Sequence, residues 1–159
     1  MNSSAVSLRE MIESVVELHR GKIGALLPIL HSVQDQLGHI PSEAVPMIAR
    51  ELSLSRAEIQ GVIGFYHDFR TEPVGEHIIH ICRAEACQAM GARELEEYAT
   101  KRLGVSYGGT TADGKFTLQP VYCLGNCACS PSVRINDDLH ARVSKPKFDE
   151  LISALEAQD

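Results

Sequence analysis

Five cysteines are the residues of this chain most able to do chemistry. Cys82 and Cys87 flank four residues in HICRAEAC, and Cys123 and Cys127 flank three residues in CLGNC. Cys129 follows two positions later. Because cysteine thiolates bind metal ions and also exchange disulfides, two spaced pairs and one additional cysteine indicate either a metal site or a thiol redox centre.

The spacing is compatible with four kinds of site. A disulfide-exchange centre is typical of C-x-x-C, which neither pair has. A structural zinc site uses closely spaced cysteine pairs, usually C-x2-4-C. The C-x3-C pair falls within that range, and the C-x4-C pair is at its upper limit. Unliganded cysteines acting as small buried hydrophobic residues are a third interpretation. A [2Fe–2S] cluster takes two thiolates on each of two irons. Two spaced pairs match that count, so we favour the cluster.

Residues beside the cysteines fit such a cluster. Gly125 has no side chain to obstruct bridging sulfides and can adopt a positive φ, and Pro131 stiffens the chain that leaves the site. Backbone N–H groups of these loops can donate to sulfur. Cys129 is expected to be a small, half-buried thiol, or else a replacement ligand for Cys127. Mixed ligation by His80 is disfavoured because four cysteines already complete the count.

Composition excludes several classes of function. The chain has 159 residues with a net charge of -6, and aromatic residues make up 5%. Nucleic-acid binding needs a basic surface, so we expect no nucleic-acid partner. No apolar run is long enough to span a bilayer, and the start does not read as a signal peptide. We therefore expect a cytoplasmic protein without direct membrane insertion, where a disulfide framework is uncommon.

The first half of the chain predicts four short helices. Apolar residues at helical spacing mark the first (Leu8, Met11, Ile12, Val15, Val16 and Leu18) and the second (Leu26, Leu27, Leu30, Val33 and Leu37). Ser42 is expected to cap a third helix that reaches Glu51. The fourth opens on the Ser55–Glu58 capping box, with Ile59, Val62, Ile63 and Tyr66 on its apolar face. Gly61 and Gly64 within it suggest close packing.

The second half changes to strand patterns. HIIHIC predicts a buried strand ending at Cys82, a helix over Leu95–Leu103 follows, and KFTLQPVYC predicts a second strand. SVRINDDLHARVS predicts two strands joined at NDD, before a last helix that Ser144 caps. The sequence therefore predicts an α/β fold with an N-terminal small helical bundle, residues 1–74, followed by a thioredoxin-like domain, residues 75–159. Pro73 and Gly75 mark the boundary.

Other motifs give weaker indications. Phe65, Tyr66 and Phe69 in GFYHDFR are expected to pack between the helical bundle and the thioredoxin-like unit, or alternatively to form a docking surface for a partner subunit. Gly108 and Gly109 lack the pattern of a dinucleotide or phosphate loop, so no NAD or flavin site is expected in this chain. No arrangement of catalytic side chains stands out, and we expect a protein without substrate chemistry of its own.

CRAEAC followed by CLGNCACSP resembles the thioredoxin-like [2Fe–2S] ferredoxin family, the 24-kDa-type subunits of NADH-dehydrogenase modules. LLPILHSVQDQLGHIP and EIQGVIGFYHDFRTEPVGEHIIHIC are similar to the helical region of that family, so the resemblance covers roughly residues 23–156. It implies one [2Fe–2S] cluster held by Cys82, Cys87, Cys123 and Cys127. It also implies an electron-transfer role beside a larger partner subunit that binds FMN and NAD.

The family includes subunits of several parent complexes. The tail CSPSVRINDDLHARVSKPKFDELI is most similar to the gamma subunit of cytoplasmic NAD-dependent formate dehydrogenase, with Ser-Pro where members from respiratory complex I more often have Ala-Pro. Formate dehydrogenase is therefore the expected parent. The alternatives are complex I and a bidirectional NAD-linked hydrogenase. An alternative of a different class is an assembly module whose loops are held by zinc.

Overall fold

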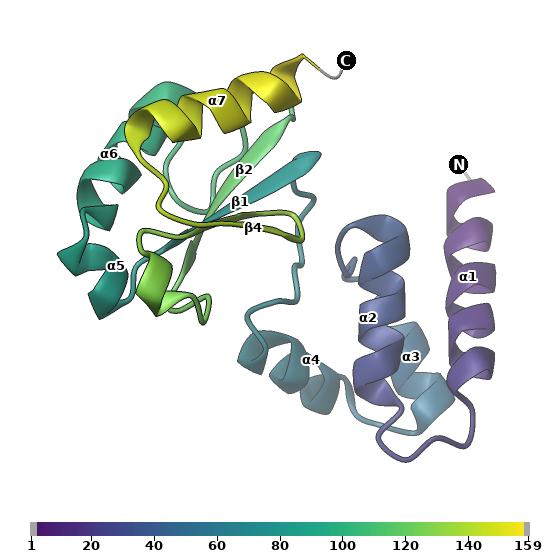
Figure 1. Cartoon of the computed structure of the whole chain (residues 1–159). Coiled ribbons are helices and arrows are strands. Elements are labelled where there is room, and N and C mark those ends of the chain that lie inside the picture. Colours follow the sequence, from purple (N-terminus) through teal and green to yellow (C-terminus); the bar gives the residue numbers. More distant parts are fainter. Residues whose placement is uncertain (1–2, 158–159) are drawn as a thin grey trace. The chain divides into compact units, whose positions relative to one another are not determined.

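The computed structural model describes residues 3–157, with side chains from Leu8 onward (Figure 1). The chain divides into two compact units, Met1–Pro73 and Val74–Asp159. The first contains four helices and the second a four-stranded sheet with helices. Within the described residues, no helix combines the length and apolar character needed to cross a membrane.

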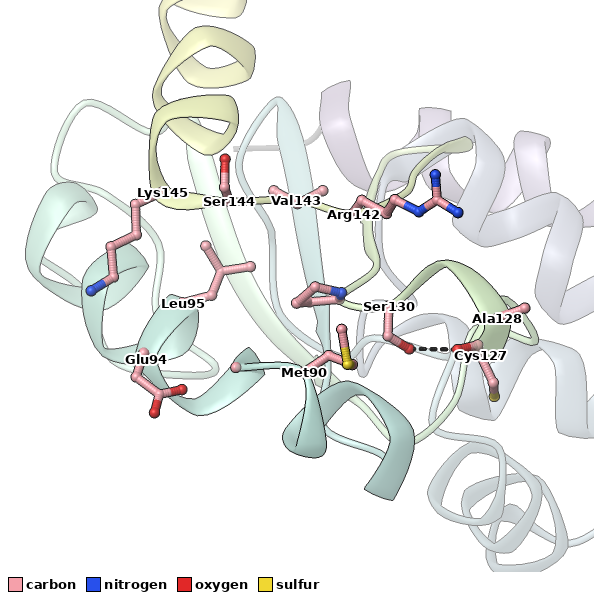
Figure 2. A pocket seen from close by; sticks show the side chains of 12 residues that line it. Met90, Glu94, Leu95, Cys127, Ala128, Ser130, Arg142, Val143, Ser144 and Lys145 are labelled. Atoms are coloured by element: carbon pink, nitrogen blue, oxygen red, sulfur yellow. Dashed lines mark hydrogen bonds between the residues drawn. The ribbon is translucent and has the colours of Figure 1, made fainter.

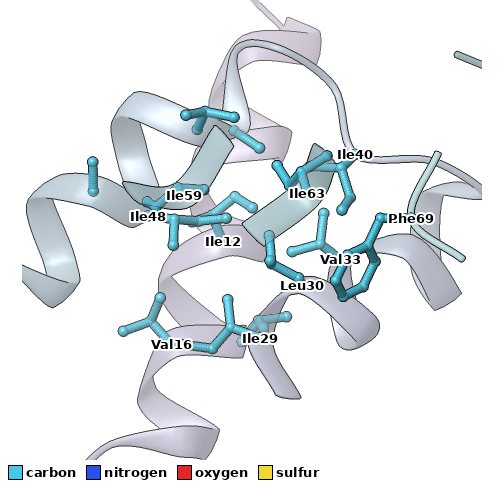
Figure 3. Packing of buried hydrophobic residues seen from close by; sticks show 14 residues of the cluster. Ile12, Val16, Ile29, Leu30, Val33, Ile40, Ile48, Ile59, Ile63 and Phe69 are labelled. Carbon is cyan, nitrogen blue, oxygen red and sulfur yellow. The ribbon is translucent and has the colours of Figure 1, made fainter. Parts of the chain in front are cut away.

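The first unit is a bundle of α1 (Ser3–His19), α2 (Leu26–Leu37), α3 (Ala44–Leu52) and α4 (Arg56–Phe65). These helices form because apolar residues recur every three or four positions, and burial of that stripe stabilises the bundle. Figure 3 shows the resulting core, which contains Ile12, Val15, Val16, Ile29, Leu30, Val33, Ile40, Ala44, Val45, Ile48, Ala49, Ile59, Ile63 and Phe69. Leu18 departs from the predicted apolar face, because 69% of it is exposed.

The helix ends follow the sequence only in part. The predicted capping box is present, with Ser55 and Glu58 each accepting the other's backbone N–H. Ser42 does not cap α3, so that prediction was wrong. Its hydroxyl instead donates to the Glu43 carboxylate at 3.2 Å, and the helix begins after Glu43 without a side-chain cap.

The prediction of close packing at the two glycines of α4 was also wrong. Gly61 and Gly64 are exposed, and a Cβ added to either would meet no atom within 4 Å. Neither glycine is required by a close approach of another segment, so each only weakens α4.

A buried glutamine fixes the segment that follows α4. The Gln34 side chain donates to the Asp68 carbonyl at 2.9 Å and accepts the Arg70 N–H at 2.8 Å. Phe69, between them, is buried and its ring lies 4.8 Å from that of His31. This polar contact satisfies a buried amide and ties residues 68–70 to α2.

The second unit is built on a sheet of order β2-β1-β3-β4. Its strands are β1 (His77–Cys82), β2 (Phe116–Val121), β3 (Val133–Ile135) and β4 (Asp138–His140). β1 pairs parallel with β2 and antiparallel with β3, and β3 pairs antiparallel with β4. The parallel pair requires a crossover, which α5 (Glu85–Ala89) and α6 (Ala92–Leu103) supply.

Helices α6 and α7 (Lys145–Glu156) complete the core of this unit, and α7 is capped by Ser144 as predicted. Apolar residues of the two helices and the sheet form one cluster: Ile79, Ile81, Leu95, Ala99, Phe116, Leu118, Val133, Ile135, Val143, Phe148 and Ile152. A short 3-10 helix, η1 (Cys127–Cys129), lies between β2 and β3. The order strand, helix, strand, strand, strand, helix confirms the predicted α/β fold class.

Candidate metal centre

The two cysteine pairs follow neighbouring strands. Cys82 is the last residue of β1 and pairs in register with Val121, the last residue of β2. Because these strands are parallel, their carboxyl ends lie at one edge of the sheet, and Cys123 comes just beyond that edge. Just after β1, the Arg83 N–H donates to the Val121 carbonyl at 2.7 Å. The sheet therefore brings together cysteines that are far apart in sequence.

The first pair lies in an apolar environment. Cys82 and Cys87 are each only 2% exposed, and they cluster with the buried Ala92. Three partly buried residues pack on this cluster: Ala84, Val121 and Leu124. Cys87 lies inside α5 rather than in a loop, contrary to the sequence interpretation. The Gln88 N–H donates to the Ala84 carbonyl at 2.9 Å, which forms a helical turn around Cys87.

The second pair is exposed and its sulfurs are close together. The Cys123 and Cys127 Sγ atoms are 3.7 Å apart, and the Gly125 N–H donates to Cys123 Sγ at 3.3 Å. Gly125 has φ +75, as the sequence suggested, which turns the loop back over Cys123. Two thiolates bound at about 2.3 Å to one tetrahedral metal, the bond length known for zinc, lie about 3.8 Å apart. The pair therefore fits one tetrahedral metal without rearrangement.

Ser130 connects the two pairs. Its hydroxyl accepts the Cys87 thiol proton at 3.3 Å and donates to the Cys127 carbonyl at 2.8 Å. Figure 2 shows the second of these bonds, from Ser130 just after η1 back to Cys127 at the start of η1. Ser130 is 6% exposed, so its hydroxyl is largely shielded from water. One side chain thus links Cys87 on α5 to Cys127 on η1.

The buried thiols have opposite shifts in acidity. Burial raises the pKa of Cys82, and the adjacent Cys87 thiol adds to the rise. Burial acts the same way on Cys87, but it is outweighed there by hydrogen bonds from the Ser130 side chain, the Ser132 backbone and Cys82. The pKa of Cys87 is therefore lowered. Cys87 is the thiol of this pair that the surroundings prepare best to ionise.

The exposed pair shows mutual repulsion. The hydrogen bond from Cys123 raises the pKa of Cys127, and the charges of Cys123 and Cys87 raise it further. Thiolates this close disfavour one another in the absence of a cation. A bound metal reverses this effect, because it deprotonates the thiols that coordinate it.

The four candidate cysteines are described best as two pairs. Across the described part of the chain, no three His, Cys, Asp or Glu side chains gather as one metal ion would require. A [2Fe–2S] cluster instead takes two thiolates on each of two irons, which suits two separate pairs. His80 contacts Arg134, its partner on β3, with Nε2 3.5 Å from the guanidinium. The donor set fits the cluster better than it fits zinc.

Cys129 is half-buried in η1, as one of the two interpretations of the sequence expected. Its N–H donates to the Asn126 carbonyl at 3.0 Å, and its carbonyl accepts the Arg142 N–H at 2.8 Å. These bonds fix the backbone on both sides of the residue. Its capacity to replace Cys127 as a ligand stays a prediction.

A cavity beside the second pair was not foreseen. Its volume is about 630 Å³, and it opens next to Cys127 (Figure 2). Charged residues at its wall are Glu94, Arg142 and Lys145, and the exposed Met90 adds an apolar patch. Met90 follows α5 and Glu94 lies in the first turn of α6, whereas Arg142 precedes α7 and Lys145 begins it. They meet only through the fold, so no local sequence pattern marks them.

The fold and the cysteine arrangement define an iron–sulfur protein of the thioredoxin-like class. The family model for the thioredoxin-like [2Fe-2S] ferredoxin matches residues 12–156. The chain therefore belongs to that family, whose members carry one [2Fe–2S] cluster.

Relatives of known name are similar along most of the chain. The E subunit of the NADH-quinone oxidoreductase of Pseudomonas aeruginosa is 37% identical over 146 residues, which cover 92% of this chain and 88% of that subunit. The E subunit of the same enzyme in Escherichia coli K12 is 35% identical, with 91% and 87% covered. Subunit 2 of the NADH-quinone oxidoreductase of Thermus thermophilus is 34% identical, with 86% and 76% covered.

A solved structure is similar to this chain in fold and, to a smaller extent, in sequence. The air-oxidised NAD⁺-reducing [NiFe]-hydrogenase contains a chain that matches 84% of this one with a TM-score of 0.72 and 26% identity. This chain spans 23% of the length of that hydrogenase chain.

Proposed function

We propose that this chain is the [2Fe–2S] electron-transfer subunit of an NAD-linked multisubunit oxidoreductase, with Cys82, Cys87, Cys123 and Cys127 as the cluster ligands. The observation that carries this proposal is the placement of two cysteine pairs at one edge of the sheet, with the Cys123 and Cys127 sulfurs 3.7 Å apart. Each pair supplies the two thiolates that one iron takes.

When bound, the cluster accepts and donates one electron at a time. The chain positions the ligands and sets their surroundings: burial excludes water from Cys82 and Cys87, and the Gly125 N–H stabilises negative charge on Cys123. Cys123 and Cys127 are exposed, so electrons exchange most directly on that side. The chain has no motif for a nucleotide phosphate, so FMN and NAD belong to a partner subunit.

The relatives support a parent complex of the NADH-quinone oxidoreductase type, because the curated proteins of 34–37% identity described above are subunits of that enzyme. The similarity to a chain of an NAD⁺-reducing hydrogenase supports the same general class. Formate dehydrogenase, the parent expected from the sequence, has support only from the tail with Ser130–Pro131 and from no relative described above. It is the second candidate.

The two spaced cysteine pairs are more typical of metal binding in a reducing compartment than of a disulfide framework, which supports a cytoplasmic location.

Analysis of the purified chain tests the cluster. We expect a reddish-brown protein with about two irons and two sulfides per chain and an EPR signal on reduction. A colourless protein with one zinc would instead support the assembly module, and a metal-free protein with a titratable disulfide would support a thiol redox centre.

Purification of the native assembly tests the parent. NAD reduction that depends on formate would identify a formate dehydrogenase, whereas NADH oxidation coupled to a quinone would identify a complex I. Dependence on hydrogen would identify a hydrogenase. Removal of this subunit should reduce electron transfer while the binding of NAD by the remaining assembly persists.

A further inference from the structure

Ser130 is not one of the four proposed ligands, but its side chain contacts two of them. Its hydroxyl lies 3.3 Å from Cys87 Sγ and 2.8 Å from the Cys127 carbonyl oxygen. These two residues are proposed ligands from different segments. The Ser130 residue is 6% exposed, so water has little access to its hydroxyl.

Ligation by Cys87 changes which atoms can donate. The free Cys87 thiol donates a hydrogen bond to Ser130 Oγ, and the Ser130 hydroxyl donates one to the Cys127 carbonyl. A metal-bound thiolate has no proton and can only accept. The Ser130 hydroxyl has one proton, and rotation about its Cβ–Oγ bond can direct that proton to the sulfur. Cys127 is exposed, so its carbonyl can then accept from water.

We infer that, in the cluster-bound protein, the Ser130 hydroxyl donates to the Cys87 thiolate and raises the reduction potential of the cluster. This inference rests on the proposed ligation. Ser130 is a positioning residue, because it acts through the ligand sulfur. An O–H···S bond stabilises negative charge on sulfur, and the reduced cluster carries one more negative charge than the oxidised cluster. The dry surroundings strengthen the bond relative to one in water.

Ser132 is the matched control in the same loop. It is also buried, at 1% exposed, but its hydroxyl faces the Asn126 carbonyl at 3.5 Å rather than a ligand sulfur. Removal of that hydroxyl keeps both the contact of Ser130 with Cys87 and the hydrogen bond from the Ser132 backbone to Cys87, because only the Ser132 side chain changes.

Redox titration of the cluster-loaded full chain, followed by EPR, tests the inference. In Ser130→Ala we expect the equilibrium constant for one-electron reduction of the cluster to fall three- to tenfold. The reduction potential should then be roughly 30–60 mV more negative, since a tenfold change corresponds to about 59 mV. Ser132→Ala should keep the wild-type potential. Ser130→Thr retains a hydroxyl and Ser130→Val has the same shape without one, so the potential of the valine variant should lie below that of the threonine variant.

The outcomes separate this inference from the proposed function. Equal potentials in wild type and Ser130→Ala, and in the threonine and valine variants, would overturn the Ser130 hydrogen bond while the cluster stands. If Ser130→Ala does not load, the threonine–valine pair decides alone. Wild-type protein without iron and sulfide would overturn the ligation, and this inference with it.

Discussion

Cys82 and Val121 are register partners at the carboxyl ends of two parallel strands. This one pairing places the segment that begins at Cys82 beside the segment that contains Cys123. The ligand arrangement therefore depends on the hydrogen bonds of the sheet as much as on the cysteines themselves.

Cluster loading should protect four cysteines from alkylation and leave the fifth reactive. In the apoprotein we expect iodoacetamide to modify the exposed Cys123 first and the buried Cys82 slowly. The raised pKa of Cys82 slows its alkylation further, because a smaller fraction of this thiol is ionised at a given pH. The alkylation rate of Cys82 should therefore continue to rise at a pH where an ordinary thiol has already reached its maximum rate. Tandem mass spectrometry gives the rate for each cysteine, because fragmentation separates Cys123, Cys127 and Cys129, which share the tryptic peptide 116–134. Rapid alkylation of Cys82 or Cys127 in loaded protein would contradict their assignment as ligands.

Replacement of a ligand should remove the cluster, and replacement of Cys129 should not. We expect Cys127→Ser to lose the EPR signal and Cys129→Ser to keep wild-type iron and sulfide. A signal that survives in Cys127→Ser and disappears in the double variant Cys127→Ser/Cys129→Ser would show that Cys129 can take over. Iron, sulfide and EPR measurements on the three variants distinguish these results.

Gly125→Ala should destabilise the cysteine loop through its backbone. Gly125 has φ +75, which costs an L-residue about 1 kcal/mol or more, although an added Cβ meets no atom within 4 Å. We expect loss of the visible absorption at a lower temperature. Gly61→Ala is the matched control, since it adds a Cβ in open space within α4 and should stabilise that helix by about 0.5–1 kcal/mol. Equal melting of wild type and Gly125→Ala would contradict the strain.

Gln34→Leu should destabilise the helical bundle. It leaves the part-buried N–H of Arg70 and the carbonyl of Asp68 without the partner that Gln34 supplies, at a cost of about 1 kcal/mol. Gln36→Leu, on the exposed face of the same helix, should change stability by less than about 0.5 kcal/mol. Urea unfolding followed by far-ultraviolet circular dichroism measures both, and similar effects in the two variants would refute the role of Gln34.

Glu58 should make the stability of the bundle depend on acid pH. Hydrogen bonds from the Ser55 backbone and then its side chain lower the pKa of Glu58 below the ordinary 4.5. Its contribution is therefore complete above pH 4.5 and is lost as the pH falls through the lower folded value. The melting temperatures of wild type and Glu58→Gln should converge with acidification.

The sequence predicted the elements best where a local pattern determines them. The period of apolar residues marked the helices of the bundle, and HIIHIC marked β1, because burial of one face or both faces leaves a direct trace in residue order. The Ser55–Glu58 box is likewise complete within four residues. Ser42 shows the limit of such patterns, since a serine near a helix start also bonds to its neighbour.

Features that depend on tertiary contacts were not predictable. Gly61 and Gly64 looked like contact points but face open space. Of the three clustered aromatic residues, Phe69 is buried in the bundle core, whereas Phe65 is 73% exposed and Tyr66 43% exposed. Phe69 thus belongs to the core of the bundle itself, and the packing of this aromatic cluster between the two units stays a prediction. The link from Ser130 to Cys87 joins residues 43 positions apart and has no local signature.

Because β1 pairs parallel with β2, the distance in space between the two pairs of proposed ligands does not depend on the number of residues that connect them. Residues 88–122 form the connection, yet the two ligand segments start from strands only about 4.8 Å apart. The turn at Ala112–Gly114, exposed at the amino end of β2, lies at the opposite end of that strand from the cysteines. A peptide tag or reporter inserted there should leave cluster assembly intact, which makes this turn a practical attachment point on the subunit.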